Sequence, residues 1–365
     1  MPSSRLSAVA VALVAAVLLG ACSAAPTATP SGSPVVIDSR PLAELDLLEN
    51  PRDYVGASTA LLASNEVAPL VGAPASSLPV TVVSRDLDGD RSVTVEKADR
   101  VIGLDIAGSI GSTIFGLGLG NSVVGRDVST TFDAALELPV VTTGGHSVNS
   151  EAIIALRPDL IITDGTVGPI DVLLQLRDAG IDIVFVDTDP SLDGVSELAR
   201  QVGAALGAAG AGELLATRLQ GEIAAKVAEI AAVTPSISSA RVRMMFLYLR
   251  GASGVYYLFG EESGADVLID ALGGIDVSDE IGLDGMKPMT DEALVAANPD
   301  LILVMTDGLA SAGGVDGLLD AKPAIALTRA GQNKRFVDMA DGEILSFGPR
   351  TPAVLDALAR AIYAP

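Results

Sequence analysis

The feature that most constrains the fold is an internal repeat, in which residues 151–161 correspond to residues 292–302. Each copy begins with helix-forming residues, continues with Pro-Asp and ends in an apolar run. Proline cannot continue a helix, and it pushes the preceding residue toward extended geometry. Each copy therefore predicts a short helix, a break and a strand. The chain predicts two similar halves with a cleft between them, which is a natural ligand site.

Short apolar runs alternate with helix-like stretches around both copies, which predicts an α/β fold with a parallel sheet and covering helices in each half. The expected strands are 101–104, 160–163, 182–186, 242–249, 301–306 and 335–339. The expected helices are 109–119, 150–157, 170–179, 265–272, 291–297 and 352–362.

Residues 213–233 predict one long helix between the two halves, because they are rich in helix formers and contain no proline. At 1.5 Å per residue this helix spans about 30 Å. The segment Thr234-Pro235-Ser236 ends it. We expect it to act as a rigid connector.

The N-terminus has the features of an export signal. Arg5 precedes an apolar run over residues 8–19, which is too short to span a bilayer and suits a signal peptide. The sequence Leu19-Gly20-Ala21-Cys22 resembles a bacterial lipobox, which predicts that Cys22 is lipidated. The alternative is an ordinary signal peptide with an incidental cysteine.

The segment that follows, rich in Ser, Ala, Thr, Gly and Pro, is typical of a flexible tether. The expected organisation is a lipoprotein signal peptide, a tether, an N-terminal extension, an N-terminal lobe, a connecting helical region and a C-terminal lobe. Their expected bounds are 1–21, 22–34, 35–97, 98–195, 196–235 and 241–365.

The extension contains two strand-like runs, 78–84 and 92–95, joined by a polar loop with three aspartates. A calcium loop of this kind requires Gly at its sixth position and Glu at its twelfth, but the sequence has Arg91 and Lys97 there. We therefore expect a hairpin with an Asp-Gly turn.

Composition excludes several functions. A net charge of −23 on 365 residues repels phosphate backbones, so no nucleic-acid partner is expected. The single Cys excludes an internal disulfide, and the single His leaves little for a Ser-His-Asp enzyme or a multi-His metal site. The glycines of residues 116–120 fail the G-x-G-x-x-G spacing, which argues against a nucleotide site.

The single histidine, His146, follows an expected strand at 139–142 and precedes the first repeat helix. It is therefore expected on a loop at the end of an element, where binding residues are common. The alternative is a solvated loop histidine.

Tyr248 and Arg250 end the first strand of the second half, where ligands of open α/β sheets collect. Two positions apart on a strand, they point to the same side. A guanidinium beside a phenol favours the phenolate, which suits ferric iron. Haem iron is held by Tyr or His in known proteins. The alternative is a core tyrosine and a surface arginine.

One lobe thus offers the only histidine and the other offers Tyr-x-Arg. At this point the chain resembles the haem-binding proteins of bacterial ABC importers, of the actinobacterial HmuT type, over essentially the whole mature length. The resemblance is carried by residues 125–127 with 130–132, 144–146, 175–180, 246–251, 256–260, 264–266 and 347–351.

The resemblance implies two Rossmann-like lobes joined by one long α-helix, a fold of the periplasmic-binding-protein type with a helical backbone. It implies a binding protein without catalysis, with haem b as the transported ligand in the cleft. His146 and Tyr248 would ligate the iron from opposite lobes, and Arg250 would support the Tyr248 oxygen.

The resemblance also implies docking on an ABC permease and its ATPase at the outer face of the cell membrane, with surface haem-binding proteins as candidate donors. Glu151 and Glu292, the repeat-related acids, match the family's docking residues. Alternatively, they only offset the positive ends of their helices.

Two features qualify the expected haem site. Gly145 stands where a polar residue is expected, and the chain has no Trp. Aliphatic side chains and methionines would then contact the haem. The methionine candidates are Met244, Met245, Met286 and Met289, and the candidate propionate partners are Arg85, Arg126 and Arg350.

Two alternatives remain open from the sequence. The same fold could bind a ferric siderophore or cobalamin, although the chain is poor in the basic and aromatic residues that an anionic chelate requires. A membrane-anchored haem-degrading or redox enzyme is less consistent, because iron that is ligated on both faces leaves no position open for turnover.

Overall fold

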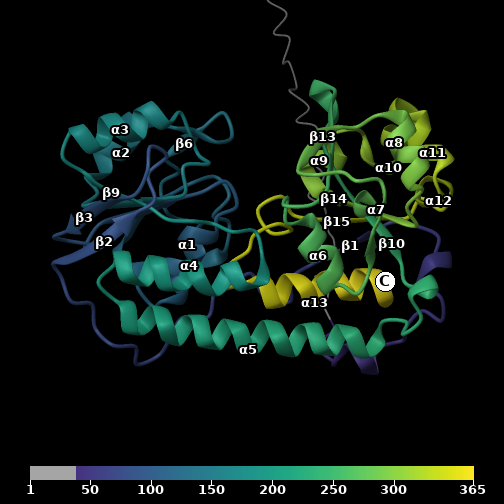
Figure 1. Cartoon of the computed structure of the whole chain (residues 1–365), viewed down its shortest axis with the longest axis horizontal. Coiled ribbons are helices and arrows are strands. Elements are labelled where there is room, and N and C mark those ends of the chain that lie inside the picture. The colour runs from purple at the N-terminus through teal and green to yellow at the C-terminus, as the bar shows by residue number, and fades with distance from the viewer. Residues whose placement is uncertain (1–37) are drawn as a thin grey trace, which may run out of the picture. The chain divides into compact units, whose positions relative to one another are not determined.

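The computed structural model describes residues 38–365, which belong to one compact unit (Figure 1). The predicted signal peptide over 1–21, the tether over 22–34 and Cys22 lie outside these residues. The described part of the chain contains no helix that is both long and apolar enough to cross a membrane.

The first sheet is parallel throughout and forms the centre of the first lobe. Its order is β5 (Val123–Arg126), β4 (Val101–Leu104), β8 (Leu160–Thr163) and β9 (Asp182–Phe185). Every residue of β4 and β8 is buried, so both faces of this sheet are covered, as a parallel sheet requires. The covering helices of this lobe are α1 (Ser109–Gly116), α2 (Ser150–Leu156) and α3 (Ile170–Asp178).

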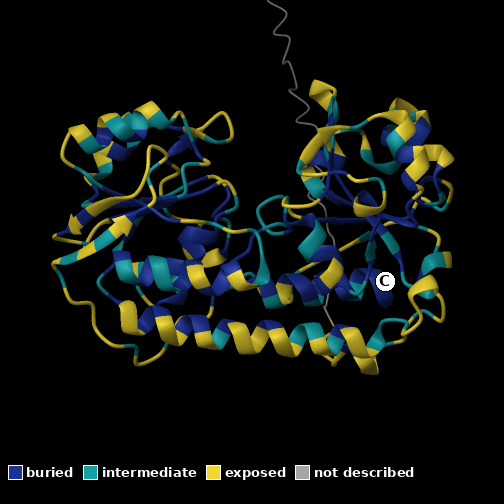
Figure 2. Ribbon diagram, in the orientation of Figure 1, coloured by how far each residue is buried: buried dark blue, intermediate teal, exposed yellow. Residues whose placement is uncertain are grey.

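Side chains alternate between the two faces of the first sheet. Val101 packs with Ile110 of α1 in one core, whereas Ile102 packs with Ile153 of α2 and Leu173 of α3 in another. The parallel sheet predicted for the first half is confirmed. Figure 2 shows the buried strands between partly exposed helices.

The second sheet is mixed rather than purely parallel. Its order is β1 (Ser58–Thr59), β15 (Phe336–Met339), β14 (Leu301–Met305), β10 (Arg243–Arg250), β11 (Val255–Phe259) and β13 (Met286–Pro288), with β12 (Ile275–Asp276) also beside β10. β11 runs antiparallel to β10, because a short turn over Gly251–Ser253 returns the chain directly beside it, and β13 in turn pairs antiparallel with β11.

The parallel part of the second sheet repeats the first one. The order β12-β10-β14-β15 corresponds to β5-β4-β8-β9. The helices around this sheet are α6 (Ala265–Ala271), α7 (Val277–Glu280), α8 (Asp291–Ala297), α9 (Thr306–Ser311), α10 (Gly314–Ala321), α11 (Pro323–Leu327), α12 (Arg329–Gln332) and α13 (Thr351–Tyr363).

The sequence repeat is also a repeat of hydrogen bonds. After α2, the Asp159 N–H donates to the Arg100 carbonyl over 2.8 Å, and the Arg100 N–H donates to the Asp159 carboxylate over 3.1 Å. After α8, Asp300 and Arg243 make the same two bonds at the same distances. Each Pro-Asp step therefore ties the end of a helix to the start of the neighbouring strand, β4 or β10.

Two helices lie side by side below the sheets, α4 (Leu192–Ala205) and α5 (Ala209–Val233). Leu215 and Leu219 of α5 pack into the core of the first lobe, whereas Ile230 packs into the core of the second. In Figure 1, α5 runs beneath both lobes. The predicted long connecting helix is confirmed, and it begins four residues before the expected start.

The N-terminal extension crosses from the second lobe to the first. The Leu42 N–H donates to Glu229 of α5 over 2.8 Å, and Arg360 of α13 donates to the Arg40 carbonyl over 2.7 Å. The chain then adds β1 to the second sheet and continues to a hairpin of β2 (Val80–Ser84) and β3 (Arg91–Val95) beside β9. The hairpin predicted from the Asp-Gly turn is confirmed.

A further crossing lies between β15 and α13. Gly342 packs against the backbone of Ser129, and Pro349 packs against Gly116 of α1, so this segment contacts the first lobe before α13 begins. The two lobes are therefore connected by the extension, by the α4–α5 region and by residues 340–350.

Candidate functional site

His146 lies in the turn of a small hairpin between β6 (Thr142–Thr143) and β7 (Ser147–Val148). The turn uses Gly144 and Gly145 at positive φ angles of 56° and 91°, which glycine adopts without a Cβ clash. The strand expected at 139–142 is reduced to this hairpin arm. In Figure 1 the hairpin lies on the side of the first lobe that faces the second lobe.

The His146 imidazole is half-buried, and its Nδ1 is buried without a hydrogen-bond partner among the described residues. Burial lowers the pKa of His146, and the positive charge of Arg250 lowers it further. The ring is therefore neutral at pH 7 and can offer a nitrogen lone pair to a metal. Because Arg250 belongs to the second sheet, the two lobes place these residues within electrostatic range of each other.

Tyr248 lies in the outer half of β10, directly opposite Tyr257 of β11. The ring of Tyr248 stacks on Phe259, with centroids 5.8 Å apart and planes 15° apart. Phe259 also stacks on Phe246, at 5.1 Å. Residues 244–247 of β10 are buried, whereas Tyr248 is only half-buried. A stack of aromatic rings therefore supports a phenol at the accessible end of the strand.

Arg250 lies over the Tyr248 ring, with its guanidinium carbon 4.7 Å from the ring centroid. Its Nη2 donates to the Asp341 carboxylate over 2.8 Å, and its Nη1 donates to the Leu249 carbonyl over 2.9 Å. Among the described residues the guanidinium makes these bonds rather than one to the Tyr248 oxygen. Arg250 thus contacts the face of the phenol ring, whereas the resemblance implied that it supports the Tyr248 oxygen, through a hydrogen bond or electrostatically.

Asp341 is a neighbour of the candidate site that sequence reasoning missed. It follows β15, and it also accepts the Asp307 N–H over 2.9 Å. An acid just beyond the carboxyl end of a parallel strand is the signal that could have drawn attention to it. Its partner, Arg250, is far away in the sequence, so no local pattern pairs the two residues.

Apolar side chains that sequence reasoning also missed lie exposed beyond the first sheet. Ile106 follows β4, Val128 follows β5, and Val140 forms a bridge with Arg126 at the end of β5. Their exposed fractions are 51%, 40% and 42%. They give the carboxyl edge of the first sheet an apolar surface.

The four candidate methionines separate by burial. Met244 and Met245 are fully buried in the cores on the two faces of β10, so they have structural roles. Met289 is partly buried beside the second of these cores. Met286 on β13 is 62% exposed and is the methionine most available to a ligand.

Arg350 is occupied by the protein itself. It is buried, its Nη1 donates to Asn65 over 2.8 Å, and it pairs with Glu343 at 3.4 Å. Its guanidinium also lies 5.8 Å from the Phe132 ring centroid. Arg350 therefore joins the C-terminal crossing to the first lobe, and its burial leaves it unavailable to a haem propionate.

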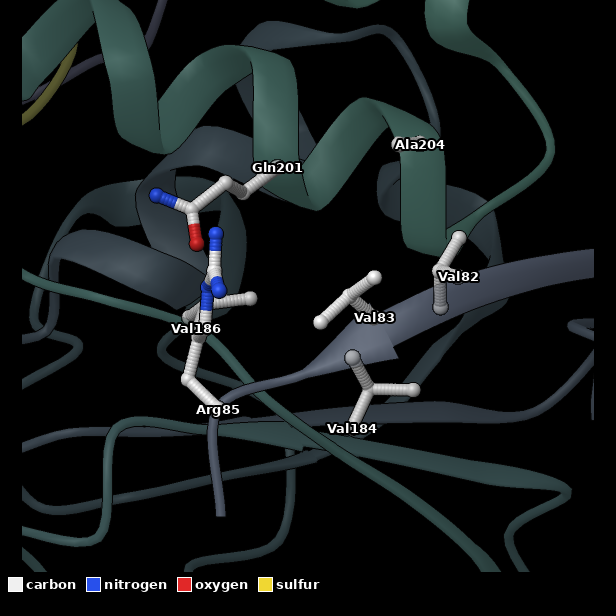
Figure 3. Close-up of a pocket in the computed structure, with 7 residues that line it drawn as sticks. All are labelled: Val82, Val83, Arg85, Val184, Val186, Gln201 and Ala204. Carbon is white, nitrogen blue, oxygen red and sulfur yellow. The ribbon is translucent and has the colours of Figure 1, made fainter. Parts of the chain in front are cut away.

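The other two arginine candidates also have partners. Arg126 donates to the carbonyls of Asp127 and Thr130. Arg85 pairs with Asp90 and, at 3.3 Å, with Asp187. Arg85 lines a cavity of about 270 Å³ between the β2–β3 hairpin, β9 and α4 (Figure 3). This cavity contains none of the three predicted ligand-site residues.

A buried acid pair lies beside the apolar edge. Asp105 and Asp127 follow β4 and β5, and the Asp105 N–H donates to the Asp127 carboxylate over 3.1 Å. Burial raises the pKa of both carboxyls. At Asp105, repulsion from the Asp127 carboxylate raises the pKa further. Within the described residues, no group of three or more His, Cys, Asp or Glu could hold a metal ion.

Glu151 and Glu292 are both exposed in the first turns of α2 and α8. The N-caps are supplied by other residues, since Asn149 accepts the Ala152 N–H and Thr290 accepts the Ala293 N–H. Both glutamates are thus free of a capping bond. In Figure 1, α2 and α8 lie on the side of the described unit opposite α5.

Comparison with known proteins agrees with this architecture. The model of the family described as periplasmic binding protein matches residues 107–341. The Bacillus subtilis (strain 168) protein YvrC, described as an uncharacterized ABC transporter substrate-binding lipoprotein, is 27% identical over 289 residues. That match covers 78% of this chain and 86% of the relative.

Solved structures give closer matches. The heme binding protein HmuT superimposes with a TM-score of 0.80 and 38% identity, covering 87% of this chain and 100% of that one. Structures of its His→Ala, Tyr→Ala and Arg→Ala variants also match. The periplasmic heme-binding protein RhuT from Roseiflexus sp. RS-1, in apo form, superimposes with a TM-score of 0.66 and 37% identity, covering 73% of this chain and 98% of that one.

Proposed function

The chain belongs to the periplasmic binding protein family, and on that premise we propose that it captures haem between its two lobes and delivers it to an ABC permease for haem-iron uptake. The family consists of binding proteins rather than enzymes, in agreement with the expectation from sequence. Several of its structural relatives are described as heme-binding, so haem is the transported ligand that the comparisons support.

One observation carries the proposal. His146 and the Tyr248–Arg250 pair come from different sheets, yet Arg250 lies near enough to His146 for its positive charge to help burial lower the pKa of the imidazole. We propose that His146 and Tyr248 ligate the haem iron from opposite sides. The match to HmuT variants changed at a histidine, a tyrosine and an arginine supports this choice of residues.

The surroundings suit a flat apolar ligand. Ile106, Val128 and Val140 from the first lobe and Met286 from the second offer exposed aliphatic and thioether surface for the porphyrin. Burying such side chains against a ligand is favourable by about 25 cal/mol per Å² of apolar surface. The neutral His146 and the ring-stacked Tyr248 then supply the two axial ligands.

We propose that the mature protein is held at the outer face of the cell membrane through lipidated Cys22, after removal of residues 1–21. The lobes would be residues 98–195 and 241–365. The name of the Bacillus subtilis relative, a substrate-binding lipoprotein, supports this location. Glu151 and Glu292 would contact the permease, since both are exposed and their helices, α2 and α8, lie on one side of the described unit.

The test is a hemin titration of the purified mature protein. We expect the wild type to develop a Soret band at one equivalent. His146→Ala and Tyr248→Phe should each weaken binding by at least tenfold, because each removes one axial ligand. The double variant should show no specific band.

Tyr256→Phe is the matched control, since Tyr256 precedes Tyr257 on β11 and packs into the opposite core beneath Lys322. A ferric siderophore and cobalamin are titrated in parallel. The proposal is wrong if either of these competes hemin away, or if both ligand variants bind hemin like the wild type.

A further inference from the structure

The guanidinium of Arg250 is held from two directions. Its Nη2 meets the Asp341 carboxylate at 2.8 Å, and its Nη1 meets the Leu249 carbonyl at 2.9 Å. With both bonds made, its carbon lies 4.7 Å from the Tyr248 ring centroid. The Leu249 bond is made with a neighbouring residue, so Asp341 is the only long-range contact among these.

Asp341 is itself fixed. One carboxylate oxygen accepts from Arg250, and the other accepts the Asp307 backbone N–H over 2.9 Å. The next residue, Gly342, packs closely on Ser129 of the first lobe, since a Cβ at Gly342 would lie 2.8 Å from the Ser129 carbonyl. The carboxylate therefore belongs to the segment that connects the two lobes.

Arg250 needs such a partner. Its side chain is 34% exposed, and an arginine that water reaches loses much of its preferred orientation without a fixed acceptor. Ion pairs in which the carboxylate and guanidinium bond directly hold that orientation. The Asp341 side chain is 22% exposed and is the better shielded of the two.

We infer that Asp341 is a positioning residue of the binding site, which holds the Arg250 guanidinium against the Tyr248 ring and so fixes the surroundings of the phenol that faces the ligand. The inference rests on the proposed function where haem is concerned. The Asp341–Arg250 and Arg250–Tyr248 contacts themselves are features of the described structure. Through Gly342 and Ser129, the same carboxylate links the phenol site to the junction between the lobes.

The central variant is Asp341→Asn. Asparagine has the shape of aspartate, and its carbonyl oxygen can still accept the Asp307 N–H, so the loop keeps that bond. Its amide group faces Arg250 with a donor instead of an acceptor. Asp341→Glu restores the carboxylate and should recover part of the effect. Asp316→Asn removes one acid from an exposed pair with Lys334 on the same lobe and controls for net charge.

Three readouts are measured, one on the haem-free protein and two on the hemin-loaded protein. In the haem-free protein, ¹⁵N relaxation of Arg250 Nε should show faster side-chain motion in Asp341→Asn than in the wild type. In the hemin-loaded protein, the ferric charge-transfer band should shift, and hemin should dissociate about two- to fivefold faster. In an Arg250→Ala background, Asp341→Asn should add no further change to either hemin measurement.

Unchanged Arg250 relaxation in Asp341→Asn overturns the inference. An equal effect of Asp341→Asn in the Arg250→Ala background also overturns it, because Asp341 would then act without Arg250. A wild type that binds no hemin refutes the proposed function instead. The relaxation measurement on the haem-free protein still decides whether Asp341 positions Arg250.

Discussion

Asp105 shows how burial changes the chemistry of one residue. Its carboxylate accepts the Ser109 N–H and hydroxyl and the Ile110 N–H, at 2.7 to 2.9 Å. Burial raises its pKa to about 7, and the charges of Asp127 and Asp164 add to this effect. The ordinary pKa of this carboxyl is 3.8. Between pH values of about 4 and about 7, the folded protein therefore keeps a proton that the unfolded chain has released.

The consequence is a stability that falls with rising pH. Asp105 favours folding most at low pH, and this contribution is lost as the pH rises from about 4 to about 7. We predict that Asp105→Asn is less stable than the wild type at pH 5 but loses less stability between pH 5 and 8. The slope of the free energy of unfolding against pH should differ between the two proteins by at most about 1.4 kcal/mol per pH unit, which corresponds to one proton.

Urea midpoints at pH 5, 6, 7 and 8 measure this difference. Asp316→Asn is the control, because the Asp316 side chain is 78% exposed and its removal should leave the slope unchanged. Parallel profiles for the wild type and Asp105→Asn would show that Asp105 ionises normally in the folded protein.

At the residue scale, the sequence identifies candidates by rarity and position. His146 stands out because the chain has one histidine, and Tyr248 and Arg250 because they end a strand. Asp341 and the apolar group around Ile106 do not stand out, since aspartates and aliphatic residues are common in this chain. Their place at the candidate site depends on contacts between distant segments.

At the element scale, local signals predict local structure well. The helix expected at 291–297 has these bounds in α8, because Thr290 caps it and Pro299 prevents its continuation. The strand β13 carries no such signal, since all three of its residues are exposed and its pairing with β11 is non-local. β1 likewise exists only through its distant partner β15.

The segment that crosses between the lobes gives a prediction at this scale. A Cβ at Gly342 would lie 2.8 Å from the Ser129 carbonyl and 3.3 Å from the Thr131 hydroxyl. Gly342→Ala should therefore push the segment away from the first lobe and lower the free energy of unfolding by about 1–3 kcal/mol.

Gly221→Ala is the matched control. Gly221 lies within α5 with no atom near its Cβ position, so alanine should raise the free energy of unfolding there by about 0.5–1 kcal/mol. Urea unfolding measures both variants. Equal effects of the same sign would mean that the Gly342–Ser129 contact does not constrain the lobes.

At the scale of the whole molecule, the repeat places Glu151 and Glu292 in equivalent exposed positions on the two lobes. If these acids dock the protein on its permease, Glu151→Gln with Glu292→Gln should weaken stimulation of the transporter's ATPase in proteoliposomes by about tenfold or more, as loss of close charge pairs does at other interfaces. Hemin binding should remain unchanged.

Asp291→Asn controls for this experiment, because Asp291 is an exposed acid in the same first turn of α8. Asp291 and Glu292 lie near the same positive helix end. If these acids only stabilise the helix, substituting either of them should have a similar, small effect on ATPase stimulation. A loss of ATPase stimulation as large in Asp291→Asn as in the double variant would contradict specific docking.

The way the N-terminal extension enters the fold has a mechanical consequence. Leu42 is fully buried and bonded to α5, and the Arg40 carbonyl is bonded to α13. Tension from the preceding residues would thus enter through the two helices beneath the lobes, before it reaches β1 or any strand of the ligand cleft. A force applied to the N-terminal end would therefore act first on α5 and α13, and the residues proposed to bind haem would experience less of it.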